Sequence, residues 1–178
     1  FRYLRDAGKL FDEITFNDAV KEFLNLRGKL ANYFDENQTE DIFDYIPPQR
    51  TNQIFTPKVT VRKMLALVEA ENPGCFDSPD KTFIDLYMKS GLFIAEIVKR
   101  LFNSPRLKEL FPDKAQRLRH IFSAQVYGLA PTEIIYRIAT NYILGFGIKI
   151  DKHNLRQADA LAAAKADKLN DLLSKLYD

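Results

Sequence analysis

Asp85 and Gly91 are the two residues of this sequence whose surroundings most clearly suggest ligand chemistry. Asp85 follows the apolar residues Phe83 and Ile84, and Gly91 precedes an amphipathic stretch that ends near Phe102. This order predicts a short buried strand, a tight turn and a helix. A cofactor can approach such a unit where the strand ends and the helix begins. A glycine at this turn also permits close helix–strand packing, and the pattern alone does not separate the two roles.

A second candidate binding element lies upstream, at Phe55-Thr56-Pro57. Thr56 and Pro57 predict a helix start, with a hydroxyl cap followed by proline at the first helical position. Apolar residues then repeat at helical spacing until Asn72-Pro73-Gly74 stops the helix. The amino end of this helix offers free N–H groups that suit a carboxylate, but a plain capped helix start has the same sequence.

The rest of the chain alternates between strand-like and helix-like segments. Gln125–Leu129 predicts a second buried strand, and a third is expected near Asn154–Gln157. The tail from Ala158 to Leu176 is rich in alanine and leucine and is expected to be mostly helical. Such alternation implies a parallel sheet with right-handed crossovers. Further helix starts are expected at Ser104-Pro105, at Asp113 for a helix through Phe122, and at Pro131-Thr132.

The predicted fold is therefore α/β: a helix-rich, partial Rossmann-like unit of about three parallel strands with an N-terminal helical segment. The strand at Phe83–Leu86 is expected to be central in it, with Tyr127 on the neighbouring strand. Residues 1–50 are predicted to form a helical lead-in and linker, and residues 51–178 the Rossmann-like portion. An apolar stripe from Val20 to Phe34 indicates the lead-in helix.

Composition excludes several classes of protein. The 178 residues suffice for one domain with a substantial core, and no apolar run is long enough to cross a bilayer, so no membrane partner is expected. The single Cys75 excludes an internal disulfide and a thiolate metal cluster. His120 and His153 lack metal-ligand spacing, so no metal is expected. A reduced, cytoplasmic setting fits this cysteine usage best.

The net charge of the chain is only +2, so its overall charge does not favour DNA binding. Any basic face must therefore come from folding. The pairs Arg62-Lys63, Lys99-Arg100 and Arg117/Arg119 could touch phosphates, but the favoured interpretation is that they form solvated helix faces.

Four segments resemble, in the same order, motifs of the S-adenosylmethionine-dependent DNA adenine-N6 methyltransferases of restriction–modification systems. The family motifs are Phe-Thr-Pro, the loop Asp-Pro-x-x-Gly-x-Gly, Tyr-Gly-x-Asp/Glu and Asp-Ala-Leu. The matching segments of this chain are Gln53–Pro57, Asp85–Gly91, Gln125–Pro131 and Gln157–Leu161.

The resemblance implies S-adenosylmethionine as the cofactor, and DNA as a partner through the full-length protein. Asp85 is expected near the ammonium group of the cofactor, as an opposite-charge contact. Asp159 is expected near the adenine amino group, and Thr56 with its neighbours at the methionine end. The full set of implied cofactor contacts is Phe55, Thr56, Pro57, Asp85, Gly91 and Asp159.

The chain departs from the family pattern at three points. Lys89 stands where the first loop glycine is expected, and Ala130 replaces the acid that accepts hydrogen bonds from the ribose hydroxyls. The catalytic motif Asn/Asp-Pro-Pro-Tyr/Phe, which holds a flipped adenine, has no match. Pro47-Pro48 is flanked by Ile46 and Gln49 and is interpreted as a linker.

The function expected from the resemblance is that of the cofactor-binding portion of such a methyltransferase. In the full-length protein it would serve transfer of methyl from S-adenosylmethionine to adenine. The chain is expected to be truncated before the catalytic motif and inactive alone. The alternative is a non-catalytic interaction or scaffold domain with a degenerate methylase fold, which Lys89 and Ala130 favour. A different Rossmann-type enzyme fits the order of the segments less well.

Overall fold

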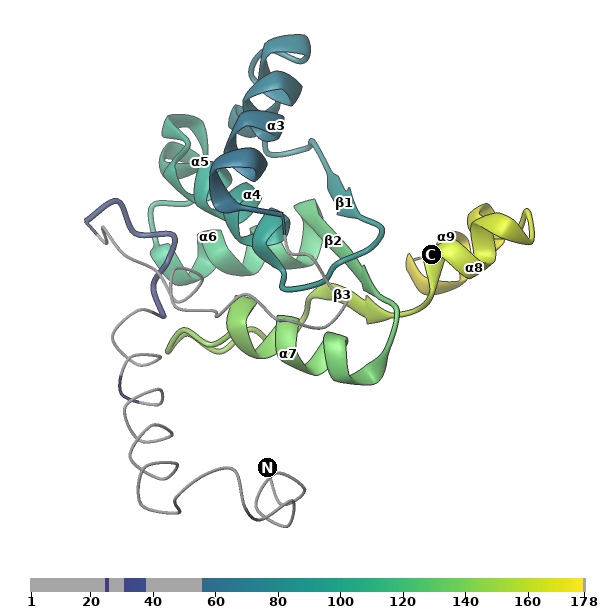
Figure 1. The fold of residues 1–178 in the computed structure, drawn as a ribbon. Helices are drawn as coiled ribbons and strands as arrows, with labels where there is room; N and C mark the ends of the chain where they lie inside the picture. The colour runs from purple at the N-terminus through teal and green to yellow at the C-terminus, as the bar shows by residue number, and fades with distance from the viewer. Residues whose placement is uncertain (1–24, 26–30, 38–55, 178) are drawn as a thin grey trace.

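The computed structural model describes residue 25, residues 31–37 and residues 56–177, and the elements in them alternate as the sequence predicts (Figure 1). A short 3₁₀ turn at Cys75–Asp77 precedes the first strand, and a π-helical segment at Ile121–Gln125 precedes the second. The other elements are α3 (Lys58–Glu71), β1 (Phe83–Asp85), α4 (Leu92–Asn103), α5 (Pro105–Leu110), α6 (Lys114–His120), β2 (Val126–Ala130), α7 (Glu133–Ile143), β3 (Asn154–Gln157), α8 (Ala160–Lys165) and α9 (Leu169–Tyr177).

The three strands form one parallel sheet in the order β1-β2-β3. The predicted helix-rich, partial Rossmann-like α/β fold is therefore confirmed. Tyr127 lies on the neighbour of β1, as predicted, where it pairs in register with Ile84. The prediction that Phe83–Leu86 is central is wrong for the described sheet, in which β2 is the middle strand. Strand β2 is added beside β1, and β3 is added on the far side of β2, so β1 remains at an edge of the sheet.

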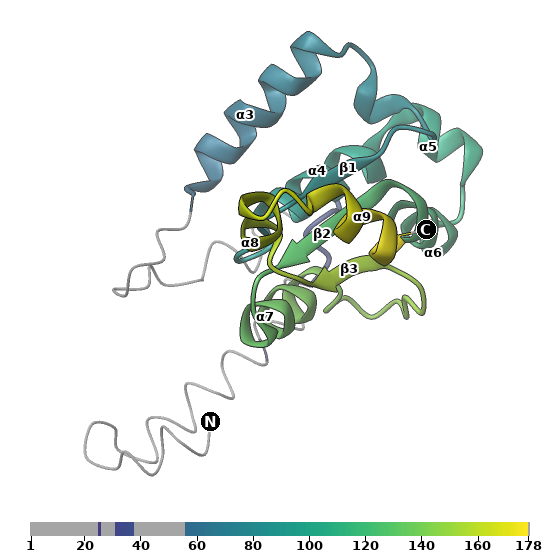
Figure 2. The ribbon, with the colours of Figure 1, turned by 90° about the vertical axis from the view of Figure 1, so that its right-hand side faces the viewer.

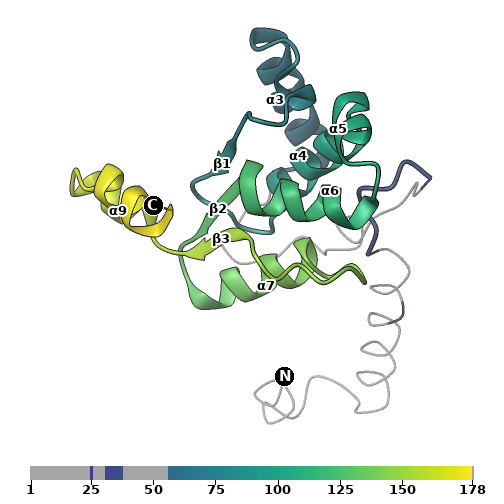
Figure 3. The same ribbon diagram turned by 180° about the vertical axis from the view of Figure 1, so that it is seen from behind.

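Helices cover both faces of this sheet. The connection from β1 to β2 runs through α4, α5 and α6, which lie together on one side of the molecule (Figure 3). On the other face α8 and α9 follow β3, and Figure 2 shows α9 across the sheet from α4. Tyr177 of α9 packs edge-on against Tyr127 of β2, with ring centroids 5.0 Å apart. The alanine- and leucine-rich tail is helical, as predicted.

Helix α4 supplies the centre of the core. Ile94, Val98 and Leu101 have no exposed surface, and their spacing of three and four residues puts them on one helix face. Burial of each such side chain contributes about 1.5–3 kcal/mol to stability. This face fixes the position of α4 against the sheet, and with it the loop that joins β1 to α4.

Part of the N-terminal segment belongs to the same core. Tyr33 and Phe34 are buried, and the Tyr33 hydroxyl donates a hydrogen bond of 2.9 Å to the Ile143 carbonyl. Both residues lie in turns, so the predicted helical stripe does not continue to Phe34. The boundary between residues 1–50 and 51–178 stays a prediction, since most of residues 1–50, Pro47-Pro48 included, lies outside the described residues.

Three of the predicted helix starts have the expected caps. Ser104 accepts a hydrogen bond from the Leu107 N–H, Asp113 from Gln116, and Thr132 from Ile135. The helix after Asp113 ends at His120, two residues earlier than predicted, where the π-helical segment takes over.

The prediction of a solvated basic face is wrong at Arg117, which is only 5% exposed. Its guanidinium donates to the carbonyls of Phe102 and Phe111 at 2.9 and 3.0 Å. A third bond of 3.1 Å reaches the carbonyl of Pro112. Arg117 thus satisfies carbonyl groups around the ends of α4 and α5 that have no partner within a helix.

One arginine from each of the other two basic pairs, Arg62 and Arg100, forms an ion pair between α3 and α4. Arg62 Nε lies 3.1 Å from Oε2 of the buried Glu96, and Arg100 Nη1 lies 2.6 Å from Glu69 Oε2. These contacts tie α3 to α4, and α3 carries residues that border the site described next.

Candidate functional site

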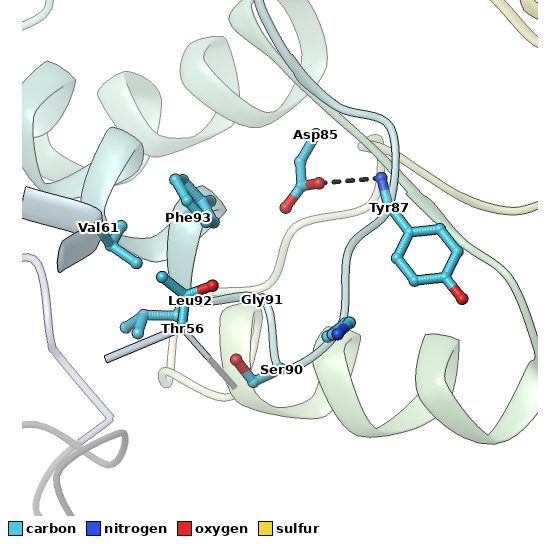
Figure 4. Close-up of a pocket in the computed structure, with 9 residues that line it drawn as sticks. Thr56, Val61, Asp85, Tyr87, Ser90, Gly91, Leu92 and Phe93 are labelled. Atoms are coloured by element: carbon cyan, nitrogen blue, oxygen red, sulfur yellow. Dashed lines mark hydrogen bonds between the residues drawn. The ribbon is translucent and has the colours of Figure 1, made fainter. Parts of the chain in front are cut away.

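A pocket of about 120 Å³ lies where β1 ends and α4 begins (Figure 4). It brings together three predicted contact residues, Thr56, Asp85 and Gly91, from two separate parts of the sequence. The position fits the general rule that ligands of parallel sheets bind beyond the carboxyl ends of the strands. The lining residues are Thr56, Val61, Asp85, Tyr87, Lys89, Ser90, Gly91, Leu92 and Phe93.

Asp85 gives the pocket its negative charge. Its carboxylate accepts a hydrogen bond of 3.0 Å from the Tyr87 N–H, which holds the loop after β1 in a tight turn (Figure 4). Burial raises the pKa of Asp85, and the Tyr87 hydrogen bond offsets only part of that effect. No lysine or arginine among the described residues forms an ion pair with it. Lys89 lines the same pocket without an ion pair to Asp85, so a cationic ligand group would be the one to contact this carboxylate directly.

Gly91 is required by packing at the start of α4. Its φ of 88° lies in the left-handed region. A Cβ added there would lie 2.5 Å from Cδ1 of Ile143 in α7, so the Ile143 side chain would have to shift to make room for it. The close contact of Gly91 is with the helix α7 and not with a strand, so the packing role differs from the predicted one. The backbone of Gly91 also forms part of the pocket wall.

The amino end of α4 faces the pocket through Leu92 and Phe93. Gly91 has no side chain to cap the helix, and the first bond to its carbonyl comes from Ala95 at 2.9 Å. Within the described chain, the N–H groups of Leu92 and Phe93 have no hydrogen-bond acceptor. The helix end therefore offers donors and a partial positive charge to an anionic group.

The upstream element borders the pocket in a different way from that predicted. Thr56 lines the pocket, but the residue that caps α3 is Pro57, and no side chain caps this helix. The prediction of a threonine hydroxyl cap is therefore wrong. The Pro57 carbonyl instead accepts bonds from Thr60 and Val61 at 2.9 and 3.0 Å. Pro57 itself is not a lining residue, and Phe55 lies outside the described residues.

The ends of β2 and β3 do not contribute to this pocket. Asp159, at the end of β3, is exposed and caps α8 by accepting a 2.9 Å bond from the Ala162 N–H. Ala130, at the end of β2, is fully buried. The nearby Glu133 is engaged with Arg137 of the next helical turn at 2.6 Å. The role of Asp159 toward an adenine stays a prediction.

Four pocket residues in and after the loop carry no motif that predicts them as contacts: Tyr87, Ser90, Leu92 and Phe93. Lys89 stands out in the sequence only as a departure from a glycine. Their position in the sequence could have identified them. They lie in or next to the short loop between Asp85 and the start of the helix, so they stay close to both ends of that loop.

No group of three or more His, Cys, Asp or Glu side chains in the described ranges is arranged to hold a metal ion. Among the helices that the structure describes, none has the length and apolar character needed to span a membrane. The polar groups that the described site offers are one carboxylate, one lysine, the hydroxyls of a serine, a threonine and a tyrosine, and the backbone of a helix start.

Comparison with known proteins gives one informative relative. The chain is similar to a protein of Mycoplasma pneumoniae described as "Uncharacterized adenine-specific methylase", with 24% identity over 135 residues. The match covers 76% of this chain and 31% of the relative, so the chain spans less than a third of that protein. No protein-family model matches the chain, and no solved structure matches it significantly. The similarity supports a relationship to methyltransferases.

Proposed function

We propose that this chain is the cofactor-binding portion of an S-adenosylmethionine-dependent DNA adenine-N6 methyltransferase from a restriction–modification protein. The observation that carries the proposal is Asp85, a partly buried carboxylate at the wall of a pocket, which forms no ion pair with a cation of the described residues although Lys89 lines the same pocket. The parallel sheet, the position of the pocket and the adenine-specific methylase relative agree with this assignment.

The residues present fit the amino-acid end of the cofactor. S-adenosylmethionine supplies an electrophilic methyl group on a sulfonium, and it also carries an ammonium and a carboxylate. Asp85 would hold the ammonium through an opposite-charge contact. Thr56 and Val61 bring the start of α3 to the wall of the same pocket.

The fit is less complete at the nucleoside end. The family has an acid for the ribose hydroxyls where this chain has the buried Ala130. Glu133 lies one turn into α7, but its carboxylate pairs with Arg137. Binding of the cofactor by this chain is therefore expected to depend strongly on the contacts around Asp85.

Titration calorimetry with S-adenosylmethionine tests the proposal. Asp85→Asn keeps the size and the acceptor for the Tyr87 N–H but removes the charge, so it is expected to weaken binding at least tenfold, as for loss of a charge-assisted contact. The matched control is Asp80→Asn, an exposed aspartate outside the pocket, which should leave the affinity unchanged. Absence of heat from the folded wild-type chain at millimolar cofactor would contradict the proposal.

Methyl transfer by the chain alone is not expected, even with cofactor bound. The sequence from residue 1 to 178 lacks the Asn/Asp-Pro-Pro-Tyr/Phe motif that would hold the target adenine in line with the methyl group. An assay with tritiated S-adenosylmethionine and unmodified genomic DNA should give no label above background. Clear incorporation into adenine would show that another residue set replaces the motif.

The second candidate is a non-catalytic interaction or scaffold domain. Lys89 in the loop and Ala130 at the end of β2 favour it, since both replace residues that the family uses for the cofactor. This candidate predicts a folded chain that binds no S-adenosylmethionine, so the same titration separates the two.

A further inference from the structure

Helix α3 carries apolar side chains on two faces, and only one of these faces is buried. Val61 and Leu65 lie one helical turn apart and are buried. Met64, Leu67 and Val68 also follow the spacing of three and four residues that defines a helix face, but they are 46%, 64% and 39% exposed. Single exposed apolar residues are ordinary, whereas several together on one helix indicate an interaction surface. We call these three residues the outer face of α3.

The buried face shows how α3 is held against the rest of the fold. Its apolar centre is flanked by two ion pairs to α4, Arg62–Glu96 at 3.1 Å and Arg100–Glu69 at 2.6 Å. Figure 2 shows α3 along the outside of the molecule, beside α4. An apolar centre with opposite charges at its flanks is therefore sufficient to dock this helix on another.

The outer face has the same composition. Lys63 and Glu71 are exposed, and within the described ranges neither forms an ion pair. Lys63 lies four residues before Leu67, and Glu71 lies four residues after it. Because four residues are about one helical turn, both charges lie on the same side of α3 as Leu67. A basic and an acidic group at equal distances from an apolar centre make this face complementary to itself.

We propose that the outer face of α3 binds the same face of a second copy of this chain, with the two α3 helices antiparallel and the two Leu67 side chains at the two-fold axis. Lys63 of each copy then lies beside Glu71 of the other, which gives two identical ion pairs across the contact. A parallel arrangement would place like charges side by side, and such contacts are unfavourable. This contact requires no cofactor, so it is independent of the proposed function.

The size of the contact sets its strength. Helix α3 has 14 residues and is therefore about 21 Å long, so the area buried is small for a protein interface. The dimer is expected to dissociate with a Kd of about 10–100 µM. Sedimentation equilibrium of the whole chain, from about 1 µM to about 500 µM, covers this range.

Leu67→Glu tests the apolar centre, because it puts two carboxylates next to each other at the two-fold axis. The Kd is expected to rise at least tenfold. Leu67 is exposed in the single chain, so the variant should keep the wild-type circular dichroism spectrum and Tm. The matched control is Ile134→Glu on α7, where the side chain is 72% exposed, and it should leave the Kd within about twofold of wild type.

Two charge reversals test the antiparallel arrangement. Lys63→Glu and Glu71→Lys each turn both ion pairs into repulsive contacts, so each should raise the Kd about threefold to tenfold. A mixed dimer of one Lys63→Glu chain and one Glu71→Lys chain regains two opposite-charge contacts. An equimolar mixture should therefore associate within about twofold of the wild-type affinity.

Three results would overturn the proposal. One is a folded wild-type chain that remains monomeric up to about 500 µM, well above the expected Kd. Another is a dimer that Leu67→Glu leaves intact, which would place the contact elsewhere, for example at the free edge of β1. The third is a mixture of the two charge variants that associates no better than either variant alone, since that excludes contact between Lys63 and Glu71.

Discussion

At the scale of single residues, Asp85 places ligand binding in conflict with stability. Burial disfavours its ionised form, and the contact that the structure provides is one backbone N–H, from Tyr87. The native state thus carries a carboxylate whose charge is stabilised better in water than in the protein. A residue kept at such a cost is expected at a binding site.

The pH dependence of unfolding follows from this conflict. Because the pKa of Asp85 is raised in the folded chain, the native state binds more protons than the unfolded state between the usual aspartate value of 3.8 and the raised value. The contribution of Asp85 to stability therefore falls as pH rises through this window and stays low above it. Asp85→Asn should have a Tm about 1–3 °C above wild type at pH 7, with the difference shrinking toward pH 4.

Thermal unfolding followed by circular dichroism across this pH range measures the difference, and Asp80→Asn is the exposed control. A Tm for Asp85→Asn that lies below wild type at pH 7 would mean that the ionised carboxylate stabilises the fold, and the account of an unsatisfied charge would be wrong.

At the scale of elements, the contact between α4 and α7 fixes the shape of the pocket loop. Gly91 sits at the start of α4 with Ile143 and Ala139 of α7 against it. The two helices come from different crossovers, so the glycine holds two βαβ units together at the site. A side chain there must displace the buried side chain of Ile143, push α7 away or tilt the start of α4.

The energetic cost of crowding at Gly91 can be measured by comparison with a second glycine that has a left-handed backbone conformation. Gly74 has φ 76° and nothing within 4 Å of an added Cβ, whereas Gly91 has φ 88° and a Cβ there would meet Ile143 at 2.5 Å. Gly74→Ala is expected to cost about 1 kcal/mol from backbone strain alone. Gly91→Ala should cost about 2–4 kcal/mol, since overpacking adds to the strain.

Urea unfolding gives both values, and the double variant Gly91→Ala/Ile143→Ala probes their coupling. Its destabilisation should be smaller than the sum of the two single changes, because the smaller side chain makes room for the new methyl group. Equal costs at Gly74 and Gly91, with additive effects, would show that the α4–α7 contact is loose.

The sequence predicted the elements whose signals are local. The third strand was expected near Asn154–Gln157, and the helix after Gly91 was expected to end near Phe102, one residue before its observed end. Three features could not be predicted because they depend on residues far apart in the chain. These are the edge position of β1, the burial of Arg117 beneath carbonyls of other elements, and the missing cap at Thr56. At the site, the acid and the glycine were predictable, whereas the packing partner of Gly91 was not.

At the scale of the whole molecule, the α/β unit and part of the N-terminal segment share one core. The Phe34 ring lies 4.6 Å from the ring of Phe102 in α4 and 5.0 Å from that of Phe146. The Asn103 side chain also donates a 2.9 Å bond to the Phe34 carbonyl. Residues 31–37 therefore stabilise the C-terminal end of α4.

Phe34→Ala tests this integration. The side chain is 3% exposed, so its loss should cost about 3–5 kcal/mol in the free energy of unfolding, measured in urea, while unfolding remains a single transition. Glu36→Gln is the matched control in the same segment: it removes an exposed ion pair with Lys108 and should cost less than about 1 kcal/mol. A loss below 1 kcal/mol at Phe34 would show that the segment is not part of the cooperative core.

The central claim is that the space between β1 and α4 binds the amino-acid end of S-adenosylmethionine, and amide chemical shifts measure this most directly. Titration of the cofactor into the isotope-labelled chain should move the amide signals of residues 85–93 in a saturable way, because their N–H groups line or flank the pocket. The signals of α9, on the opposite face of the sheet, should stay in place. Unchanged signals at residues 85–93 at saturating cofactor, or shifts centred on α9, would contradict the account.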